Sequence, residues 1–268
     1  MSGAGDLLAA YDADVRSTFA KRLPGGWAPS QDGPLTRCLT TQGGFAMAAT
    51  SLAELSDDEL AALADRTVAY YAERGRRFEW KTYDHDRPDL GAVLRRHGLE
   101  PEDHEALVIG RAADLATDAP VPDGLGLRTV HARADLERVA EMESAVWGED
   151  WSWLADELAD RINEPHGPAT VYVVEDGDLV VSAAWLTPVV GTRFAGLWGG
   201  STLAGYRGRG IYRALVARRA RDAVAAGYTL LQVDASDDSR PILERLGLHV
   251  VGGTTPYVWT PPEPPDPE

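Results

Sequence analysis

Cysteine is almost absent from this chain, because Cys38 is the only one among 268 residues. A single thiol cannot form an intrachain disulfide, and it argues against a metal site built from thiolates. The six histidines show no metal-ligand spacing either. We therefore expect neither a disulfide framework nor a bound metal.

Long apolar runs are also absent. No stretch approaches the roughly 20 apolar residues that span a bilayer. Residues 1–6 lack the basic and apolar regions of a signal peptide. We expect a chain that does not contact membranes and that resides in the cytoplasm.

Basic residues are outnumbered, since 26 Lys and Arg face 42 Asp and Glu, for a formal charge of −16. Such a surface repels phosphate backbones, so we expect no nucleic-acid partner. It is compatible with a cationic substrate drawn in by the field of the protein, although acidic surfaces commonly serve solubility alone. The hydrophobic fraction of 44% is sufficient for a sizeable core.

Glycine and arginine alternate in one short segment, Tyr-Arg-Gly-Arg-Gly-Ile-Tyr at residues 206–212. It follows a strand-like run at 194–202 and opens an Ala-rich amphipathic helix. Alternate glycines let backbone N–H groups point inward, and the helix adds its unpaired first-turn N–H groups and the positive end of its dipole. Arg207 and Arg209 add charge-assisted hydrogen bonds. The segment predicts a site for a phosphate or pyrophosphate.

Three readings of this loop compete with one another. A P-loop needs Lys-Ser or Lys-Thr after its last glycine, whereas Ile211 and Tyr212 follow Gly210 here. A dinucleotide fingerprint needs a third glycine at position 213, where this chain has arginine. A Gly-rich turn that merely caps a helix is the plain alternative.

The segment resembles the coenzyme A loop of the GNAT N-acetyltransferases, whose pattern is Gln/Arg-x-x-Gly-x-Gly/Ala. Arg207 and Gly210 match, while Tyr212 stands where the last small residue is expected. A second block, residues 236–248, resembles the family's Asn-x-x-Ala-x-x-Leu-Tyr-Glu-Lys-Leu-Gly-Phe. The resemblance covers about residues 124–260.

This resemblance implies an α/β (α+β) fold, with a mixed β-sheet that splays open beside the loop and is flanked by helices. Hydrophobic periodicity and turn residues agree with the family's order of elements. We expect strands at 125–130, 171–175, 179–189, 194–202, 229–234, 250–251 and 257–259, and helices at 132–146, 151–162, 211–226 and about 239–246.

The first half of the chain resembles a degenerate repeat of the second half. A strand pair or one long strand at 35–50 is followed by a Ser56-x-x-Glu59 capping box, a helix to about residue 73, a strand at 78–83 and a short helix that ends near Gly98. The phosphate loop is missing, because residues 51–55 hold neither glycine nor arginine. An unrelated α/β domain is the alternative.

We therefore divide the chain into four parts. Residues 1–115 form a degenerate GNAT-like domain that lacks the coenzyme A loop and helps to shape the substrate pocket. A linker at 116–124 leads to the acetyl-CoA-binding GNAT domain at 125–260. A Pro-rich tail at 261–268 is expected to be disordered.

The reaction that the resemblance implies is transfer of an acetyl group from acetyl-CoA to an amine of a small molecule, by direct attack in a ternary complex. The expected cofactor contacts come from the end of a strand, the loop and the last helix. They are Ser201, Thr202, Leu203, Arg207, Gly208, Arg209, Gly210, Ile211, Tyr212, Ser236 and Ser239. Trp147 and Trp198 are expected to border the acceptor pocket.

The family's usual acid and base are missing. Leu243 stands at the position of the tyrosine that protonates the thiolate, and residues 194–202 contain no carboxylate. Glu143 and Tyr257 are the substitutes we consider for proton transfer. Proton transfer by bulk water is a further alternative.

Two functions stay open. The chain is an N-acetyltransferase or, because the usual acid and base are absent, a non-catalytic acyl-CoA-binding or sensing protein. Another acyl donor such as succinyl-CoA is a third reading. The sequence names neither the acceptor nor the oligomeric state.

Overall fold

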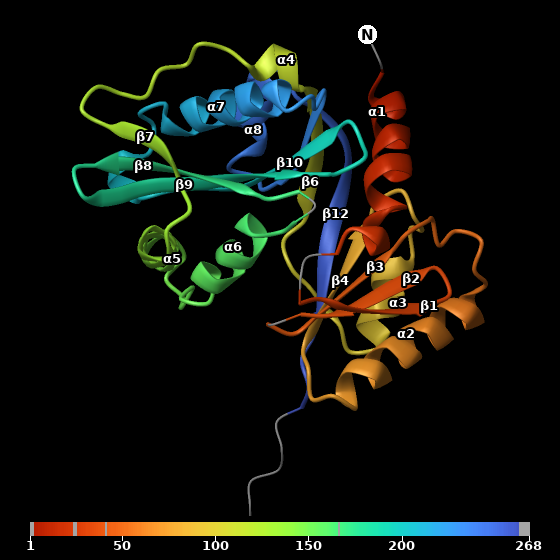
Figure 1. Cartoon of the computed structure of the whole chain (residues 1–268). Coiled ribbons are helices and arrows are strands. Elements are labelled where there is room, and N and C mark those ends of the chain that lie inside the picture. The colour runs from red at the N-terminus through yellow and green to blue at the C-terminus, as the bar shows by residue number, and fades with distance from the viewer. Residues whose placement is uncertain (1–2, 24–25, 41, 166, 263–268) are drawn as a thin grey trace, which may run out of the picture. The chain divides into compact units, whose positions relative to one another are not determined.

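The computed structural model describes residues 3–23, 26–40, 42–165 and 167–262. The chain forms two compact units (Figure 1). The first contains the chain up to Leu107, the segment Asp234–Arg240 and the chain from Val250 onward, and the second contains Val108–Val233 and Pro241–His249. Residues 263–268, where the sequence predicts disorder, lie outside the described residues. Within the described ranges, no helix is long and apolar enough to cross a membrane.

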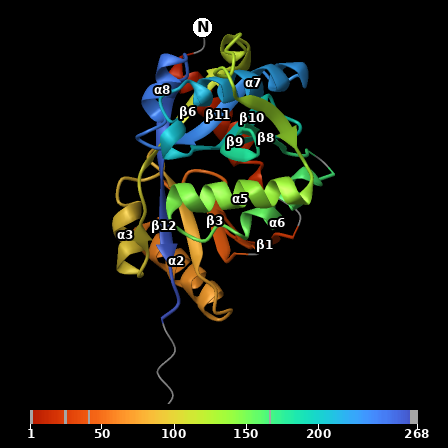
Figure 2. The same cartoon turned by 90° about the vertical axis from the view of Figure 1, so that its left-hand side faces the viewer.

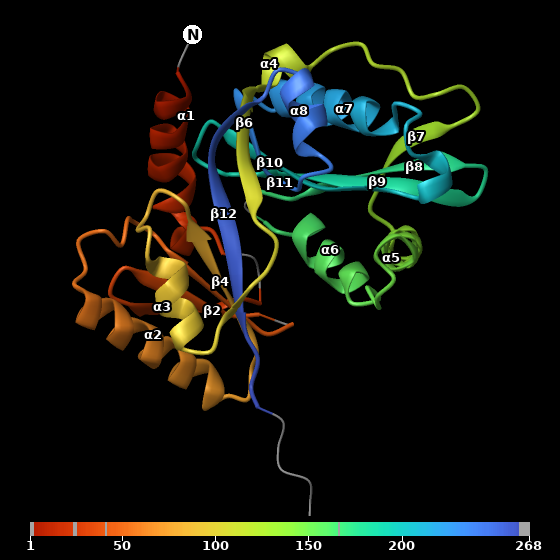
Figure 3. The ribbon, with the colours of Figure 1, turned by 180° about the vertical axis from the view of Figure 1, so that it is seen from behind.

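The first unit is built on strands in the order β1-β2-β3-β4-β12, and β5 pairs with β12. Figure 3 shows β4 beside β12. β3 and β4 are parallel, and the other neighbours are antiparallel. The elements are α1 (Ala4–Tyr11), a π-helical turn (Asp12–Arg16), a 3-10 turn (Phe19–Lys21), β1 (Ala28–Asp32), β2 (Leu35–Leu39), β3 (Gly44–Ala48), α2 (Asp57–Ala72), β4 (Phe78–Tyr83), α3 (Leu90–Arg96), β5 (Glu100–Pro101) and β12 (His249–Trp259).

The start of α2 follows from its sequence. The Ser56 hydroxyl accepts from the Glu59 backbone N–H, and the Glu59 carboxylate accepts from the Ser56 N–H at 2.8 Å. This arrangement confirms the predicted capping box. One face of α2 then packs with α3 and the sheet around Trp80, whose side chain is fully buried. The predicted strand at 78–83 is also confirmed.

The last strand differs from the sequence expectation. Instead of two strands at 250–251 and 257–259, β12 is continuous from His249 to Trp259. It pairs with β4 from Thr254 opposite Tyr83 to Trp259 opposite Phe78. Glycines and threonines at 252–255 resemble a turn in isolation. The ladder with β4 from Thr254 onward, together with the bond from the Asp84 N–H to the Gly253 carbonyl oxygen, holds the strand extended here.

The second unit has strands in the order β11-β10-β9-β8-β7, with β6 beside β11. Helices α5 and α6 cover one face of this sheet and α7 covers the other (Figures 1 and 2). The elements are β6 (Glu105–Arg111), α4 (Ala112–Leu115), β7 (Gly126–Val130), α5 (Arg133–Trp147), α6 (Leu154–Ile162), β8 (Thr170–Asp176), β9 (Leu179–Pro188), β10 (Phe194–Thr202), a 3-10 turn (Ala204–Tyr206), α7 (Ile211–Ala225), β11 (Leu230–Ala235) and α8 (Arg240–Arg245).

The sheet of the second unit opens at one point. β10 pairs in parallel with β11 only from Phe194 to Gly196. Its antiparallel pairing with β9 continues as far as Thr202. The carboxyl end of β10 therefore extends beyond its pairing with β11, and the two strands separate there. This confirms the predicted splay of the sheet beside the loop.

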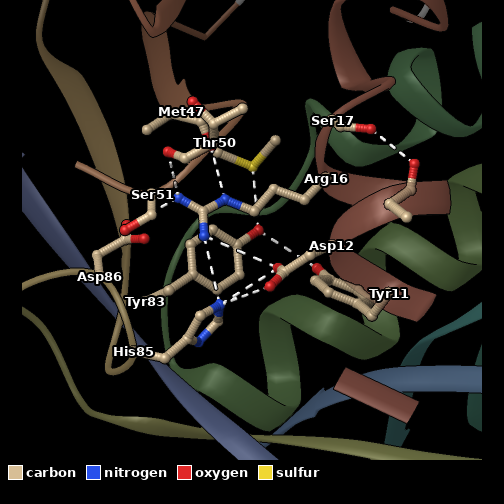
Figure 4. Close-up of polar contacts among 12 residues, drawn as sticks. Tyr11, Asp12, Arg16, Ser17, Met47, Thr50, Ser51, Tyr83, His85 and Asp86 are labelled. Carbon is tan, nitrogen blue, oxygen red and sulfur yellow. Dashed lines mark hydrogen bonds and ion pairs between the residues drawn. The ribbon is translucent and has the colours of Figure 1, made fainter. Parts of the chain in front are cut away.

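In the first unit, the carboxyl ends of the parallel strands β3 and β4 are occupied by a side chain of the chain itself (Figure 4). Arg16 is 1% exposed, and its guanidinium donates to the carbonyl oxygens of Ala48 at 2.7 Å and Thr50 at 3.0 Å. It also pairs with the Asp86 carboxylate at 2.8 Å and lies 4.2 Å above the centre of the Tyr83 ring. Open α/β sheets bind ligands at such strand ends. Here the chain's own arginine fills the place.

Replacing Arg16 by methionine should lower the free energy of unfolding by about 3–5 kcal/mol, because it leaves the Asp86 carboxylate buried and unpaired. Arg66→Met is the matched control, since Arg66 is half exposed and pairs with Asp32 at the surface. The control should cost at most about 1 kcal/mol. Urea unfolding followed by circular dichroism measures both. Equal losses in the two variants would contradict a structural role for the buried pair.

Candidate active site

The Gly-rich loop has a backbone that only glycine adopts readily. Gly208 has φ 74° and Gly210 has φ 90°, both in the left-handed region. Gly210 is the N-cap of α7, so the unpaired N–H groups of the first helical turn lie directly after the loop. Arg207 does not point freely outward, because its Nε donates to the Thr202 carbonyl oxygen at 3.0 Å and ties the loop to the end of β10.

A hollow of about 460 Å³ lies between this loop and α8. Three arginines line it: Arg209 from the loop, Arg213 from the first turn of α7 and Arg245 from the end of α8. Within the described residues, none of the three forms an ion pair with a carboxylate. Their charges are thus available to an anionic ligand. The sequence pattern did not single out Arg213 and Arg245 as phosphate ligands, although helical spacing places Arg213 in the first turn of α7 and Arg245 at the end of α8.

β10 carries a bulge where it approaches the loop. The register with β9 shifts between Gly199 and Ser201, and Gly199 and Gly200 have φ values of 65° and 98°. A Cβ at Gly200 would lie 2.8 Å from the Tyr212 ring. The large Tyr212 therefore fits where the family pattern has a small residue, because Gly200 has no side chain.

The three residues after the bulge were expected to offer backbone N–H groups to the cofactor. The Leu203 N–H already donates to the Val181 carbonyl oxygen at 2.9 Å, so it is engaged within the unit. The hydroxyls of Thr202 and Ser182 lie 2.9 Å apart and bond to each other. The Ser201 side chain, on β10, interacts with the Glu143 carboxyl of α5.

A buried arginine supports the bulge from the α7 side. Arg219 is 1% exposed, and its Nη1 donates to the carbonyl oxygens of Trp185 at 3.3 Å and Trp198 at 3.1 Å. It thus connects β9 to β10. Burial lowers the pKa of this guanidinium.

Arg219→Met should lower the free energy of unfolding by about 1–3 kcal/mol for the carbonyl groups it leaves unpaired. It should also weaken donor binding, because β10 loses its support. Its neighbour Arg218 is the control: it is one-third exposed and pairs with Asp222 along the same helix. Arg218→Met should change stability by at most about 1 kcal/mol. Thermal unfolding of both variants tests this, and indistinguishable midpoints would refute it.

Glu143 lies on α5, facing the end of β10. Its side chain is 1% exposed, and its Oε2 accepts from the Trp147 indole N–H at 2.9 Å. Oε1 has no hydrogen-bond partner among the described residues. Burial raises the pKa of this carboxyl, and the side chains of Ser201 and Trp147 oppose the rise. A carboxyl with a raised pKa and an unpaired oxygen is suited to accept a proton.

Tyr257, the other residue considered for proton transfer, belongs to the first unit. It is 7% exposed and its hydroxyl accepts from Arg95 at 3.3 Å. The side chain covers Gly91, whose added Cβ would lie 2.0 Å from the hydroxyl. It lines a hollow of about 380 Å³ in that unit together with residues of β4 and α3. Its part in proton transfer stays a prediction.

The tryptophans near Glu143 form a stack. The ring centres of Trp147 and Trp151 are 6.2 Å apart, and those of Trp151 and Trp153 are 5.2 Å apart. Trp151 and Trp153 pack against the core beneath α5 and α6, whereas Trp147 is 58% exposed. Trp198 lies on β10 opposite Trp185. Trp147 thus offers an apolar surface beside the Glu143 carboxyl.

The remaining positions named from the sequence, Ser236, Ser239 and Leu243, lie in or next to α8. The hydroxyls of Ser236 and Ser239 lie 3.2 Å apart in the exposed turn that leads into α8. Leu243 is fully buried in the core and has no proton to donate.

One group of titratable side chains was not anticipated. In the first unit, the Lys81 ammonium donates to the buried Asp234 carboxylate. Burial, with the nearby charge of Asp234, raises the pKa of Glu105 to about 7. The alternation of residues along the strands did not predict that Lys81, Glu105 and Asp234 lie close together, because Asp234 is 153 residues from Lys81.

Comparison with known proteins gives a consistent result. Residues 136–248 match the model of the acetyltransferase (GNAT) family. The fold is similar to a GCN5-related N-acetyltransferase from Kribbella flavida, with a TM-score of 0.66 and 18% identity over 96% of both chains. It is also similar to a tandem GNAT protein from the clavulanic acid biosynthesis pathway, with a TM-score of 0.64 and 14% identity over 92% of this chain and 87% of that one. No curated protein matches this chain by sequence.

Proposed function

Since residues 136–248 match the model of the acetyltransferase (GNAT) family, we propose that the chain transfers an acetyl group from acetyl-CoA to an amine of a small molecule. The observation that carries this proposal is the hollow between the Gly-rich loop and α8, with three arginines that have no acidic partner among the described residues. Such a site suits the phosphate groups of coenzyme A.

The donor is held by the loop and the helices beside it. The backbone at Gly208 and Gly210 and the first-turn N–H groups of α7 receive the pyrophosphate, and Arg209, Arg213 and Arg245 neutralise its charges. In the first unit, residues 51–55 hold neither glycine nor arginine, and Arg16 fills the ends of β3 and β4. We therefore expect one acetyl-CoA per chain.

The chemistry requires an amine that has lost its proton. The nitrogen lone pair attacks the thioester carbon, the C–N bond forms, and the C–S bond breaks with its electron pair leaving on sulfur. Glu143 Oε1 accepts the proton from nitrogen, because this atom is buried and has no partner in the described part of the chain. Water supplies the proton to sulfur, since Leu243 cannot.

A non-catalytic acyl-CoA sensor is the second candidate. The leucine at the position of the family's tyrosine and the absence of a carboxylate on β10 favour it. In this case the donor would bind, but no amine would accelerate release of its thiol.

Two measurements distinguish these functions. Isothermal titration with acetyl-CoA should give one site per chain, and absence of binding would overturn both candidates. Release of free thiol from acetyl-CoA is then followed with a panel of primary amines. Turnover above the buffer rate supports the transferase, whereas saturable binding without turnover supports the sensor.

A further inference from the structure

A second hollow, of about 380 Å³, belongs entirely to the first unit. It is enclosed by the end of β4, the turn after this strand, α3 and Tyr257 of β12. Its volume is within the range of pockets that hold small molecules. The arginine-lined hollow of the second unit shares no residue with it. The proposed donor site therefore leaves this hollow without a function.

The Tyr257 hydroxyl lies against α3 at a position that has no side chain. A Cβ at Gly91 would lie 2.0 Å from the hydroxyl oxygen, so glycine leaves the room that the hydroxyl occupies. The hydroxyl accepts from Nη1 of Arg95 at 3.3 Å, and its own proton is left to donate. Among the described residues, none accepts that proton. The Tyr257 hydroxyl is therefore a hydrogen-bond donor available in the wall of the hollow.

Arg95 is the second donor in this wall. Its side chain is exposed, and within the described part of the chain it forms no ion pair with a carboxylate. Arg87, the other arginine that lines the hollow, is held by two carboxylates at 2.6 and 2.7 Å. Asp84 also lines the hollow, and its carboxylate already accepts from the His104 ring at 3.0 Å. Arg95 is thus the charge that the hollow offers to a ligand.

We propose that this hollow binds a small organic acid, whose carboxylate accepts from the Arg95 guanidinium and the Tyr257 hydroxyl. Both groups have only N–H or O–H protons left to offer, and a carboxylate can accept from both through its two oxygens. The inference goes beyond the proposed acetyl transfer and does not depend on it.

The rest of the lining favours an organic acid over an inorganic anion. Pro88, Leu90 and Ala92 line the same hollow and bring apolar surface to it. A hydrocarbon skeleton can cover this surface, and burial of apolar area is favourable. Inorganic phosphate has no such part, so it gains only the polar contacts.

Three probes separate charge, shape and apolar contact: phenylacetate, its neutral analogue phenylacetamide, and inorganic phosphate. Isothermal titration of the full chain, in a buffer without phosphate, measures the affinity for each. Phenylacetate should bind at least about 10-fold more tightly than phenylacetamide, because hydrogen bonds to an ionised group are the stronger ones. An equal concentration of phosphate should not displace phenylacetate.

Two variants remove the proposed contacts. Arg95→Met should weaken phenylacetate binding by about 10-fold or more, and Tyr257→Phe by about 3-fold or more. Arg96→Met is the matched control, since Arg96 is an exposed neighbour on the same helix that does not line the hollow. It loses the same charge and should keep the affinity. Arg245→Met removes a charge from the hollow of the second unit and should keep it too.

The outcomes decide the proposal without any measurement on acetyl-CoA. Equal affinity for phenylacetamide, displacement by phosphate, or no binding of phenylacetate at millimolar concentration overturns the organic-acid site. An unchanged affinity in Arg95→Met does the same. A loss confined to Arg245→Met would place the acid in the second unit and overturn the site in the first. The proposed acetyl transfer is untouched by each of these results.

Discussion

Glu143→Gln should lower kcat by about 10²- to 10⁴-fold, the usual range for loss of a general base. The side chain keeps its shape and its bond from Trp147, so the loss isolates the proton-accepting function. The affinity for acetyl-CoA should stay unchanged in titration. Steady-state thiol release with an amine that the wild-type chain acetylates measures the effect.

The same variant should be more stable than the wild type at neutral pH. Burial raises the folded-state pKa of Glu143 above the ordinary value of 4.5. The folded state therefore favours the protonated carboxyl, and stability falls as the pH rises from 4.5 through the folded pKa. Glutamine cannot ionise, so its advantage should appear above pH 4.5 and vanish below it. Unfolding midpoints between pH 4 and 8 test the sign.

Glu141→Gln is the control for both measurements, because Glu141 is an exposed residue of the same helix. It should change neither kcat nor the pH dependence of stability appreciably. Full activity in Glu143→Gln would remove Glu143 from the mechanism and leave proton transfer to water. A loss of stability at pH 8 would show instead that the carboxylate form is paired in the folded protein.

Gly210→Trp should weaken acetyl-CoA binding by at least about 100-fold, the equivalent of some 3 kcal/mol. Among the described residues beyond its chain neighbours, the atom nearest to an added Cβ is Nη2 of Arg213 at 3.7 Å, so the indole would enter the arginine-lined hollow rather than clash with the core. The left-handed φ of 90° adds backbone strain that alters the N–H groups of the loop. Isothermal titration measures the affinity.

Gly124→Trp separates the two causes. Gly124 has φ 83°, and within the described part of the chain no atom beyond its chain neighbours lies within 4 Å of an added Cβ, so it carries the same backbone strain away from the hollow. This control should lose some stability and keep its affinity. If both variants bind acetyl-CoA equally well, the donor does not use this loop.

Local patterns predicted the elements whose causes are local. The capping box at Ser56 and Glu59 starts α2 because both partners lie within one turn. β4 and β10 begin and end at the predicted residues, since alternating apolar residues bounded by turn residues are sufficient to define them. The patterns did not predict α1 or β1. β1 has mostly exposed, polar residues and exists through its ladder with β2.

The sequence by itself predicted the Gly-rich loop at residues 206–212 and its resemblance to the GNAT family. Alternating glycines, adjacent arginines and a helix start are close along the chain, and left-handed backbone at Gly208 and Gly210 is a property that glycine carries with it. The same reasoning named Glu143 and Tyr257 as the two substitutes for proton transfer, and it did not choose between them. The burial of Glu143 and its unpaired oxygen depend on how α5 packs against the end of β10.

Only the tertiary structure decided which side chains that are distant in the sequence lie next to one another. Arg95 meets Tyr257 across 162 residues because of the register of β12 with β4, and a shift of one residue would send the Tyr257 side chain to the opposite face. Arg16 meets Asp86 across 70 residues at the ends of two parallel strands. Register and strand order arise from long-range hydrogen bonds and packing, which leave no periodic signal in the residues they join.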